Sequence, residues 1–181
     1  MRDCVLLADV FNDFAHEDGE RLLRSFREAV DGMHELLSWA RERGTPVIFA
    51  NDAYGDWSDA PAIVRRARRG RGGALMDRIR PEPGEPFVVK PRYSAFDHTP
   101  LSILLEERRV ERLLLGGMAT ERCVAQTAID AREEGLKVTV VTTACAAVDP
   151  RLAEIALTYL VEVAGVFVTP DARAAASDGE A

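Results

Sequence analysis

The sequence has few of the residues that build disulfide frameworks or metal centres. It contains only three cysteines and three histidines in 181 residues. The cysteines, Cys4, Cys123 and Cys145, are odd in number and lack the spacing typical of metal sites, which argues against a disulfide framework. We therefore expect free thiols.

The sequence also lacks an excess of positive charge and any long apolar run. Its formal net charge is -7, which disfavours general nucleic-acid binding. No apolar run approaches the length needed to span a membrane. Asp9 interrupts the first apolar run too early for the core of a signal peptide. We expect a cytoplasmic protein whose partner is a small molecule, with no role for nucleic acid or membrane.

The length allows one well-buried core and is too short for two ordinary domains. Hydrophobic residues make up 47% and charged residues 29%, which is typical of a globular protein. We expect a single domain over residues 1–181. Residues 171–181 are rich in Ala, Asp and Gly, and we expect this tail to fray.

Short apolar runs alternate with amphipathic segments along the chain. Residues 20–43 carry apolar side chains at helical spacing, and Gly44 follows as a natural C-cap. The short runs are mostly continuous, which is typical of parallel strands buried on both faces. The pattern predicts a three-layer α/β/α, Rossmann-like domain with a six-stranded, mainly parallel sheet. The expected strands are residues 5–10, 46–50, 87–90, 112–116, 137–142 and 166–168, and the expected helices are residues 20–43, 101–108, 120–134 and 152–163, with one or two short helices in 53–86.

Three chemically active side chains follow the same positional rule. Asp9 and Lys90 end expected strands, and Cys123 comes shortly after another. Binding sites of parallel sheets lie at the carboxyl ends of the strands, so we expect the three to converge there. A carboxylate, an ammonium and a thiol together form an activated nucleophile. Each alone also fits a plainer role, as a turn cap, a strand-end lysine or a core thiol; their joint placement favours catalysis.

The segment before Cys123 suits a nucleophile. With Thr120 as N-cap, Cys123 lies in the first helical turn, at the positive end of the helix dipole. That position lowers a thiol pKa, and free N–H groups at a helix start suit an oxyanion hole. Gly116 and Gly117 upstream let the backbone come close to a substrate.

Four segments, in this order, resemble the isochorismatase-like cysteine hydrolases, a family that includes nicotinamidases and N-carbamoylsarcosine amidases. The resemblance runs from about residue 6 to residue 168. The matching segments are LLADVFNDF at 6–14, NDAYGDW at 51–57, KPRYSAF at 90–96 and GGMATERCV at 116–124, followed by Thr127 and Ala128.

The resemblance implies a catalytic triad of Asp9, Lys90 and Cys123. It also implies a cis peptide before Ala119 and an oxyanion hole made by the N–H groups of Ala119 and Cys123. The implied reaction cleaves an amide or other C–N bond through a thioester, with Asp9 moving the proton and Lys90 orienting Asp9. A homo-oligomer, a dimer or larger, is implied as well.

The loops that flank the catalytic edge supply candidates for the substrate pocket. We expect Phe14, Asp52, Trp57 and Phe96 to line it, although packing under a loop is an equal alternative for the aromatic residues. Residues 65–71 hold five arginines. A solvated helix face or subunit contact is the more ordinary role for this cluster, and anion binding is the alternative.

The resemblance to nicotinamidases does not extend to the residues of their metal site. Those enzymes use an Asp-x-His pair after the second strand together with further histidines. Here Ala53 and Tyr54 follow Asp52, and we expect none of the three histidines, His16, His34 and His98, to lie near Asp52. We therefore expect no metal and no other cofactor.

Two other functions stay open at this point. One is an ester or ether hydrolase on the same fold, and the other is a non-enzymatic binding protein that has kept the fold. Isochorismatases proper, which cleave a vinyl ether, lack the cysteine, so Cys123 favours the amidase-like branch. A buried Asp and Lys beside a thiol have no purpose in a mere scaffold.

Overall fold

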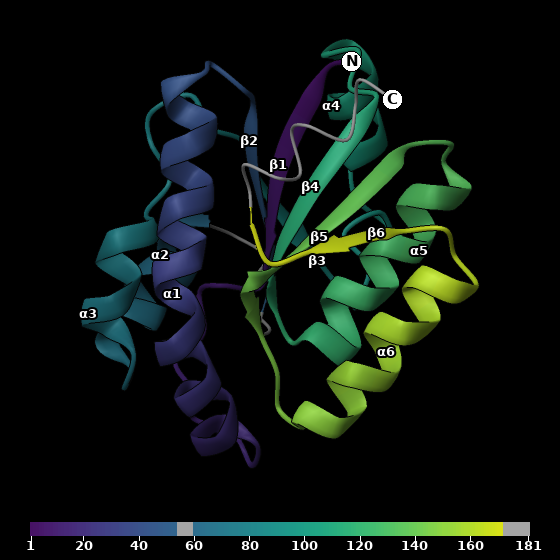
Figure 1. Ribbon diagram of the computed structural model, residues 1–181. Coiled ribbons are helices and arrows are strands. Elements are labelled where there is room, and N and C mark those ends of the chain that lie inside the picture. The colour runs from purple at the N-terminus through teal and green to yellow at the C-terminus, as the bar shows by residue number, and fades with distance from the viewer. Residues whose placement is uncertain (54–59, 172–181) are drawn as a thin grey trace.

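A parallel six-stranded sheet with helices on both faces forms the molecule (Figure 1). This computed structural model describes residues 1–53 and 60–171. The strand order is β3-β2-β1-β4-β5-β6, and every neighbouring pair is parallel, as the alternation of strands and helices predicts.

The strands are β1 (Asp3–Ala8), β2 (Val47–Asp52), β3 (Phe87–Lys90), β4 (Arg112–Met118), β5 (Lys137–Ala146) and β6 (Phe167–Thr169). The helices are α1 (Gly19–Glu42), α2 (Ala60–Arg69), α3 (Gly73–Met76), α4 (Leu101–Glu107), α5 (Ala125–Glu133) and α6 (Pro150–Glu162), with a 3₁₀ turn η1 (Asp77–Ile79) and a π-helical turn η2 (Thr120–Val124).

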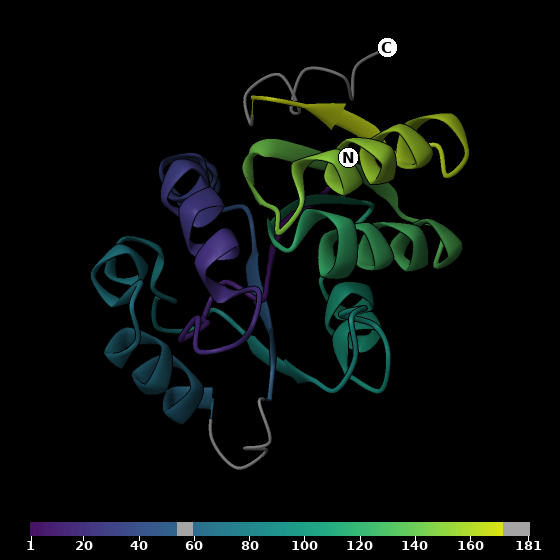
Figure 2. The ribbon, with the colours of Figure 1, turned by 90° about the horizontal axis from the view of Figure 1, so that it is seen from below.

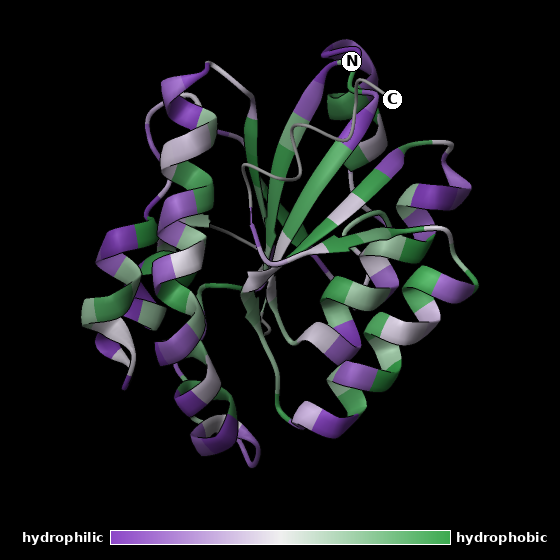
Figure 3. Cartoon of the chain, in the orientation of Figure 1, coloured by the Kyte–Doolittle hydropathy of each residue, from purple (hydrophilic) through white to green (hydrophobic). Residues whose placement is uncertain are grey.

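Each face of the sheet has its own hydrophobic core, which gives the three predicted layers. Figure 2 shows α1, α2 and α3 on one side of the sheet and α4, α5 and α6 on the other. Successive side chains of a strand point to opposite faces. Leu7 and Leu114 therefore join the core beneath α1, whereas Leu6 and Leu115 join the core beneath α4, α5 and α6. The strands are predominantly hydrophobic along their length (Figure 3), as burial on both faces requires.

Two glycines of β4 lie where the neighbouring strands leave no room for a Cβ atom. Gly117 has φ +125°, and a Cβ there would lie 2.1 Å from the carbonyl oxygen of Ala8 on β1. A Cβ on Gly116 would lie 2.9 Å from the carbonyl oxygen of Ala144 on β5. Both glycines therefore serve contacts between strands, and the expectation that they admit a substrate is corrected.

Several boundaries differ from those that the sequence predicts. β1 ends at Ala8, so Asp9 follows the strand, and β5 continues to Ala146 beyond a register irregularity with β4. Residues 60–79 fold into three short helical pieces. Of the tail expected to fray, residues 172–181 lie outside the described part of the chain. Within the described residues, no helix has the length and apolarity needed to cross a membrane.

Candidate active site

Asp9, Lys90 and Cys123 meet at the carboxyl edge of the sheet, where the sequence places them. Asp9 follows β1, Lys90 ends β3, and Cys123 lies in η2, just after β4. Lys90 Nζ is 2.5 Å from Asp9 Oδ2 and 3.6 Å from Cys123 Sγ. All three residues are buried, and Lys90 is entirely out of contact with solvent. A carboxylate, an ammonium and a thiol are thus in mutual contact away from bulk water.

The carboxylate of Asp9 is fixed by its own backbone and by the neighbouring strand. Asp9 has φ +56°, a left-handed conformation that Asp tolerates better than most residues. Its N–H donates to the Ala50 carbonyl at 2.8 Å, and its Oδ1 accepts from the Asp52 N–H at 2.6 Å. Since Oδ2 faces Lys90, both carboxylate oxygens have a donor and the side chain has little freedom.

The ammonium of Lys90 is held on the opposite side by a backbone carbonyl. Lys90 Nζ donates to the Arg92 carbonyl at 2.7 Å. Burial lowers the pKa of the ammonium, but Asp9, Cys123 and Asp52 raise it by more, so the pKa lies above its ordinary value. Lys90 therefore keeps its charge at neutral pH and can stabilise a negative charge on Asp9 or Cys123.

The thiol of Cys123 keeps its proton in the resting site. Burial raises its pKa, the Asp9 carboxylate raises the pKa further, and Lys90 lowers it. The prediction of a lowered pKa is wrong for the resting site, because burial and the Asp9 carboxylate raise the pKa by more than Lys90 lowers it. The Asp9 carboxyl has a raised pKa as well, since burial outweighs the lowering by Lys90 and by its hydrogen bonds. A raised pKa makes Asp9 a stronger base for the thiol proton.

The turn that carries Cys123 begins differently from the prediction. The peptide bond between Met118 and Ala119 is cis, as the family resemblance implies. Thr120 is the first residue of a π-helical turn, and its Oγ1 donates to the Ala146 carbonyl at 3.1 Å. Thr120 therefore anchors the turn to β5 and is not the expected N-cap. Cys123 still lies in the first turn of the helical segment that continues into α5.

A cavity of about 280 Å³ opens beside the three residues. Asp9 and Cys123 form part of its wall, as does Ala119, the other expected contributor to an oxyanion hole. Asp52 also lines it, in keeping with its expected place in the pocket. The other described lining residues are Asn12, Asp13, Ala15, His16, Leu22, Arg66, Tyr93, Met118, Arg122 and Val148.

Two of the three aromatic residues expected in the pocket lie elsewhere. Phe14 is fully buried in the core beneath α1, with its ring 5.5 Å from that of Phe26. Phe96 packs against the core on the other face and is not among the lining residues. Trp57 lies outside the described residues. Phe14 is therefore a core residue and Phe96 a half-buried residue packed against the other core, and the prediction that they line the cavity is corrected.

Some residues of the site carry no obvious signal in the sequence. Asn51 is almost fully buried, and its amide both accepts from the Phe11 N–H at 2.9 Å and donates to the Phe11 carbonyl at 3.1 Å. It thereby fixes the loop that follows Asp9. Arg122 lines the cavity next to the nucleophile and pairs with Asp18 at 2.8 Å. The sequence offers one signal for such residues, which is their position: Asn51 directly precedes Asp52 at a strand end, and Arg122 directly precedes Cys123.

The described residues around Asp52 do not group into a metal site of the nicotinamidase type. His16 lines the same cavity as Asp52, which corrects the expectation that all three histidines are remote from it. Even so, no group of three His, Cys, Asp or Glu side chains suited to a metal ion occurs within residues 1–53 and 60–171. Such a site needs several ligands on one small patch. His34 and His98 are exposed on other parts of the surface.

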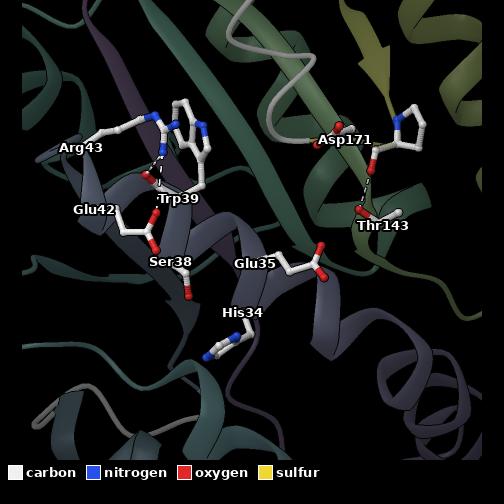
Figure 4. Close-up of a pocket in the computed structure, with 9 residues that line it drawn as sticks. His34, Glu35, Ser38, Trp39, Glu42, Arg43, Thr143 and Asp171 are labelled. Atoms are coloured by element: carbon white, nitrogen blue, oxygen red, sulfur yellow. Dashed lines mark hydrogen bonds and ion pairs between the residues drawn. The ribbon is translucent and has the colours of Figure 1, made fainter.

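A second hollow, of about 600 Å³, lies between α1 and the chain around Thr143, Pro170 and Asp171 (Figure 4). His34 and Trp39 belong to its wall, and Arg43 lies over the Trp39 ring at 5.1 Å. Thr143 faces them from β5 and donates to the Pro170 carbonyl at 2.6 Å. None of the residues that line this hollow is a cysteine or part of a buried ion pair. The cavity beside Cys123 therefore remains the candidate site.

The arginine cluster is engaged with acidic residues of the same chain. Arg66 pairs with Asp13, Arg68 with Asp77, and Arg71 with Glu20, each at 2.7 Å. These partly exposed ion pairs match the more ordinary role expected for the cluster. Arg66 also brings the cluster to the wall of the cavity.

The chain is similar to proteins of one family over almost its whole length. The family model described as the isochorismatase domain matches residues 3–172. YaaI of Bacillus subtilis, an uncharacterised isochorismatase family protein, is 30% identical over 168 residues, which are 92% of this chain and 93% of YaaI. Two crystal structures share the fold. The nicotinamidase/pyrazinamidase PncA of Bacillus subtilis has a TM-score of 0.76 and 28% identity, covering 93% of this chain and 100% of PncA. The N-carbamoylsarcosine amidase of Thermoplasma acidophilum has a TM-score of 0.71 and 27% identity, covering 93% and 96% of the two chains.

Proposed function

Because the chain belongs to the isochorismatase family of hydrolases, we propose that it cleaves an amide or other C–N bond of a small molecule through a thioester on Cys123. One observation carries this proposal: Lys90 Nζ contacts both the Asp9 carboxylate and the Cys123 thiol at the wall of a cavity. Two solved relatives are named as amidases, of nicotinamide and of N-carbamoylsarcosine. Both names describe amidases of small molecules, which supports an amide or other C–N bond as the bond that this chain cleaves.

The first half of the reaction forms the thioester. Asp9 takes the proton of the Cys123 thiol while Sγ attacks the carbonyl carbon of the substrate. The carbonyl oxygen gains negative charge, which the N–H groups of Ala119 and Cys123 would stabilise in the proposed oxyanion hole. When the tetrahedral intermediate collapses, the C–N bond breaks, and the amine leaves with the proton that Asp9 returns.

The second half of the reaction releases the acid. Water attacks the thioester carbonyl, and Asp9 accepts its proton. The C–S bond then breaks, and the sulfur regains a proton from Asp9, which restores the resting thiol. The product is a carboxylic acid, or a carbamic acid when the substrate is a carbamoyl compound.

Lys90 favours this proton transfer from a thiol with a raised pKa, because its ammonium stabilises the negative charge that forms on the sulfur. When the proton moves from Cys123 to Asp9, the negative charge moves from the carboxylate to the sulfur. Lys90 Nζ contacts both atoms, so the ammonium stays beside the charge throughout. The thiolate therefore forms only during attack and does not persist in the empty site.

The size of the cavity limits the substrate to a small molecule. Its volume of about 280 Å³ lies at the lower limit of typical ligand pockets, roughly 300–1,000 Å³. Asp52, which lines this cavity, is proposed as part of the substrate pocket.

The test is a hydrolysis screen with small amides, carbamoyl compounds and esters of matched size, run on the wild type and on Cys123→Ala. We expect turnover of at least one amide or carbamoyl compound that the variant lacks. Turnover of esters alone would replace the proposed bond type with the ester alternative. Equal turnover by both proteins would contradict the proposed nucleophile.

We further propose that the chain assembles as a dimer or larger homo-oligomer through α6. Leu152, Ile155 and Tyr159 are 43%, 57% and 50% exposed and follow one another at helical spacing. Two such helices packed antiparallel around a two-fold axis would bury these side chains. Light scattering at micromolar concentration should give at least a dimer for the wild type. Ile155→Glu should give a monomer, whereas Ile103→Glu, an equally exposed site on α4, should not. A monomeric wild type would contradict this proposal.

We also propose a reducing, cytoplasmic location. The three cysteines are free, and the proposed nucleophile acts only as an unoxidised thiol.

A further inference from the structure

The three residues before Cys123 are each attached to a different part of the chain. Thr120 Oγ1 donates to a carbonyl at the end of β5 at 3.1 Å. Arg122 reaches the opposite side and pairs with Asp18, just before α1, at 2.8 Å. Glu121, between them, is half-buried and reaches the connection between β5 and α6. The position of the nucleophile is therefore set by contacts that arise far away in the sequence.

The contact of Glu121 is made by a single carboxylate oxygen. Its Oε1 accepts from the N–H groups of Val148 and Asp149, both at 3.0 Å. Val148 lines the catalytic cavity, and Asp149 caps the first turn of α6 with its own side chain. Glu121 thus joins the turn that carries Cys123 to a wall of the cavity and to the start of a helix.

The second carboxylate oxygen of Glu121 shows that stability alone does not favour this side chain. Oε2 is out of contact with solvent and finds no hydrogen-bond partner within the described part of the chain. A buried oxygen without a donor opposes folding. The benefit of a carboxylate here therefore lies in the two hydrogen bonds of Oε1, which fix the distance between the nucleophile turn and the cavity wall.

We propose that Glu121 is a positioning residue for the oxyanion hole. This inference rests on the proposed function. Glu121 is not among the residues that line the cavity and acts through the turn to which it belongs. By holding that turn against Val148 and Asp149, it fixes the N–H groups of Ala119 and Cys123 where charge develops on the substrate. A misplacement of about 1 Å in such a site lowers a rate on the order of 10²-fold.

Two probes of Cys123 separate this role from general stability. Acylation by p-nitrophenyl acetate passes through a tetrahedral oxyanion and needs the N–H groups. Alkylation by iodoacetamide needs the thiol but develops no oxyanion. Both rates are measured per titratable thiol, with the rate of Cys123→Ala subtracted as background. The variants are Glu121→Ala, Glu121→Gln, which keeps an oxygen for both N–H donors, and Glu133→Ala, an exposed glutamate on α5, as matched control.

We expect Glu121→Ala to lower the acylation rate by at least about tenfold and to leave the alkylation rate within about threefold, since only the oxyanion contacts are misplaced. Glu121→Gln should restore most of the acylation rate, and Glu133→Ala should match the wild type. Equal loss of both rates, or no loss of acylation, would overturn the inference, and so would a failure of Glu121→Gln to restore the rate.

The proposed function fails in a different way. Acylation of Cys123→Ala at the wild-type rate would contradict the proposed nucleophile and overturn the inference with it. Failure of the Glu121 variants alone would leave the nucleophile in place.

Discussion

Two ion pairs, one partly buried and one fully buried, lie at opposite ends of the central strands and differ in what else they contact. At the amino end, Asp3 of β1 and Arg112 of β4 form a two-pronged pair, with N–O distances of 2.9 and 2.7 Å. At the carboxyl end, Asp9 and Lys90 pair at 2.5 Å. Both carboxylates are well supplied with donors and hollows lie beside both pairs, but among the described residues only the second pair is hydrogen-bonded to a thiol.

The comparison shows that a buried charge pair is not by itself a sign of catalysis. A guanidinium binds a carboxylate through two parallel N–H groups and holds it in one geometry. The single ammonium of Lys90 is a point charge that contacts Asp9 and Cys123 at once, so it stays favourable when charge moves between them. We therefore assign Asp3 and Arg112 to stability and Asp9, Lys90 and Cys123 to the proposed chemistry.

The largest expected effect follows from removing the thiol. Cys123→Ala should abolish hydrolysis, because none of the other described residues at the wall of the cavity carries a thiol that could form the thioester. The side chain is small, so the free energy of unfolding should change by only about 1 kcal/mol. Cys145→Ala is the matched control and should keep full activity. Full activity of Cys123→Ala on the true substrate would end the proposed mechanism.

The second effect compares the two carboxylates directly. Asp9→Asn should lower kcat about 10²–10⁴-fold, the range typical of general acid–base catalysis, whereas Asp3→Asn should leave kcat of the folded protein unchanged. In the wild type, kcat/KM should rise with pH as Asp9 loses its proton. Because burial raises the pKa of Asp9, this rise should come at higher pH than for an exposed aspartate. A loss of less than about threefold in Asp9→Asn would remove it from the role of base.

The third effect tests the structural pair at the amino end. Arg112→Met should lower the free energy of unfolding by about 3–5 kcal/mol, because it leaves the largely buried Asp3 carboxylate without its partner. The kcat of the folded variant should stay at the wild-type value. Urea unfolding and kinetics on the same samples separate the two quantities. A large fall in kcat would mean that the two ends of the sheet are not independent.

The fourth effect is a change in the reactivity of the thiol. The Lys90 ammonium lowers the pKa of Cys123, so Lys90→Ala should raise that pKa. At any fixed pH less thiolate is then present, and alkylation by iodoacetamide should slow. The alkylation–pH profile should move to higher pH. Lys137→Ala, at an exposed position on β5, should give the wild-type profile. An unchanged profile in Lys90→Ala would show that the ammonium does not act on the thiol.

The smallest expected effect is that of metal removal. Activity should survive extensive chelation, because the proposed chemistry stabilises charge with N–H groups and Lys90. Elemental analysis of the purified protein accompanies the assay. Stoichiometric zinc, iron or manganese, with activity lost on chelation and restored by the metal, would show that the region around Asp52 has been misinterpreted.

The fold was predictable because its signals are local. Continuous apolar runs and the helical spacing within residues 20–43 depend only on neighbours in the chain, and they give the six strands and the long helix. The convergence of Asp9, Lys90 and Cys123 followed from one rule about the carboxyl ends of parallel strands.

What was missed depends on contacts between distant segments. Phe14 follows the candidate loop yet turns into the core beneath α1, and Thr120 bonds to β5 instead of capping its own helix. His16 reaches the cavity through a loop whose path no periodicity describes. The raised pKa of Cys123 arises from burial, which only the packed structure reveals.

The most direct test of the central claim is to trap the covalent intermediate. The protein is incubated with p-nitrophenyl acetate, quenched in acid during the burst of p-nitrophenolate release, digested and mapped by mass spectrometry. We expect one acetyl group per chain, on the peptide that contains Cys123, and no such group in Cys123→Ala. An acetyl group on another residue in proportion to the burst, with Cys123 unmodified, would contradict it.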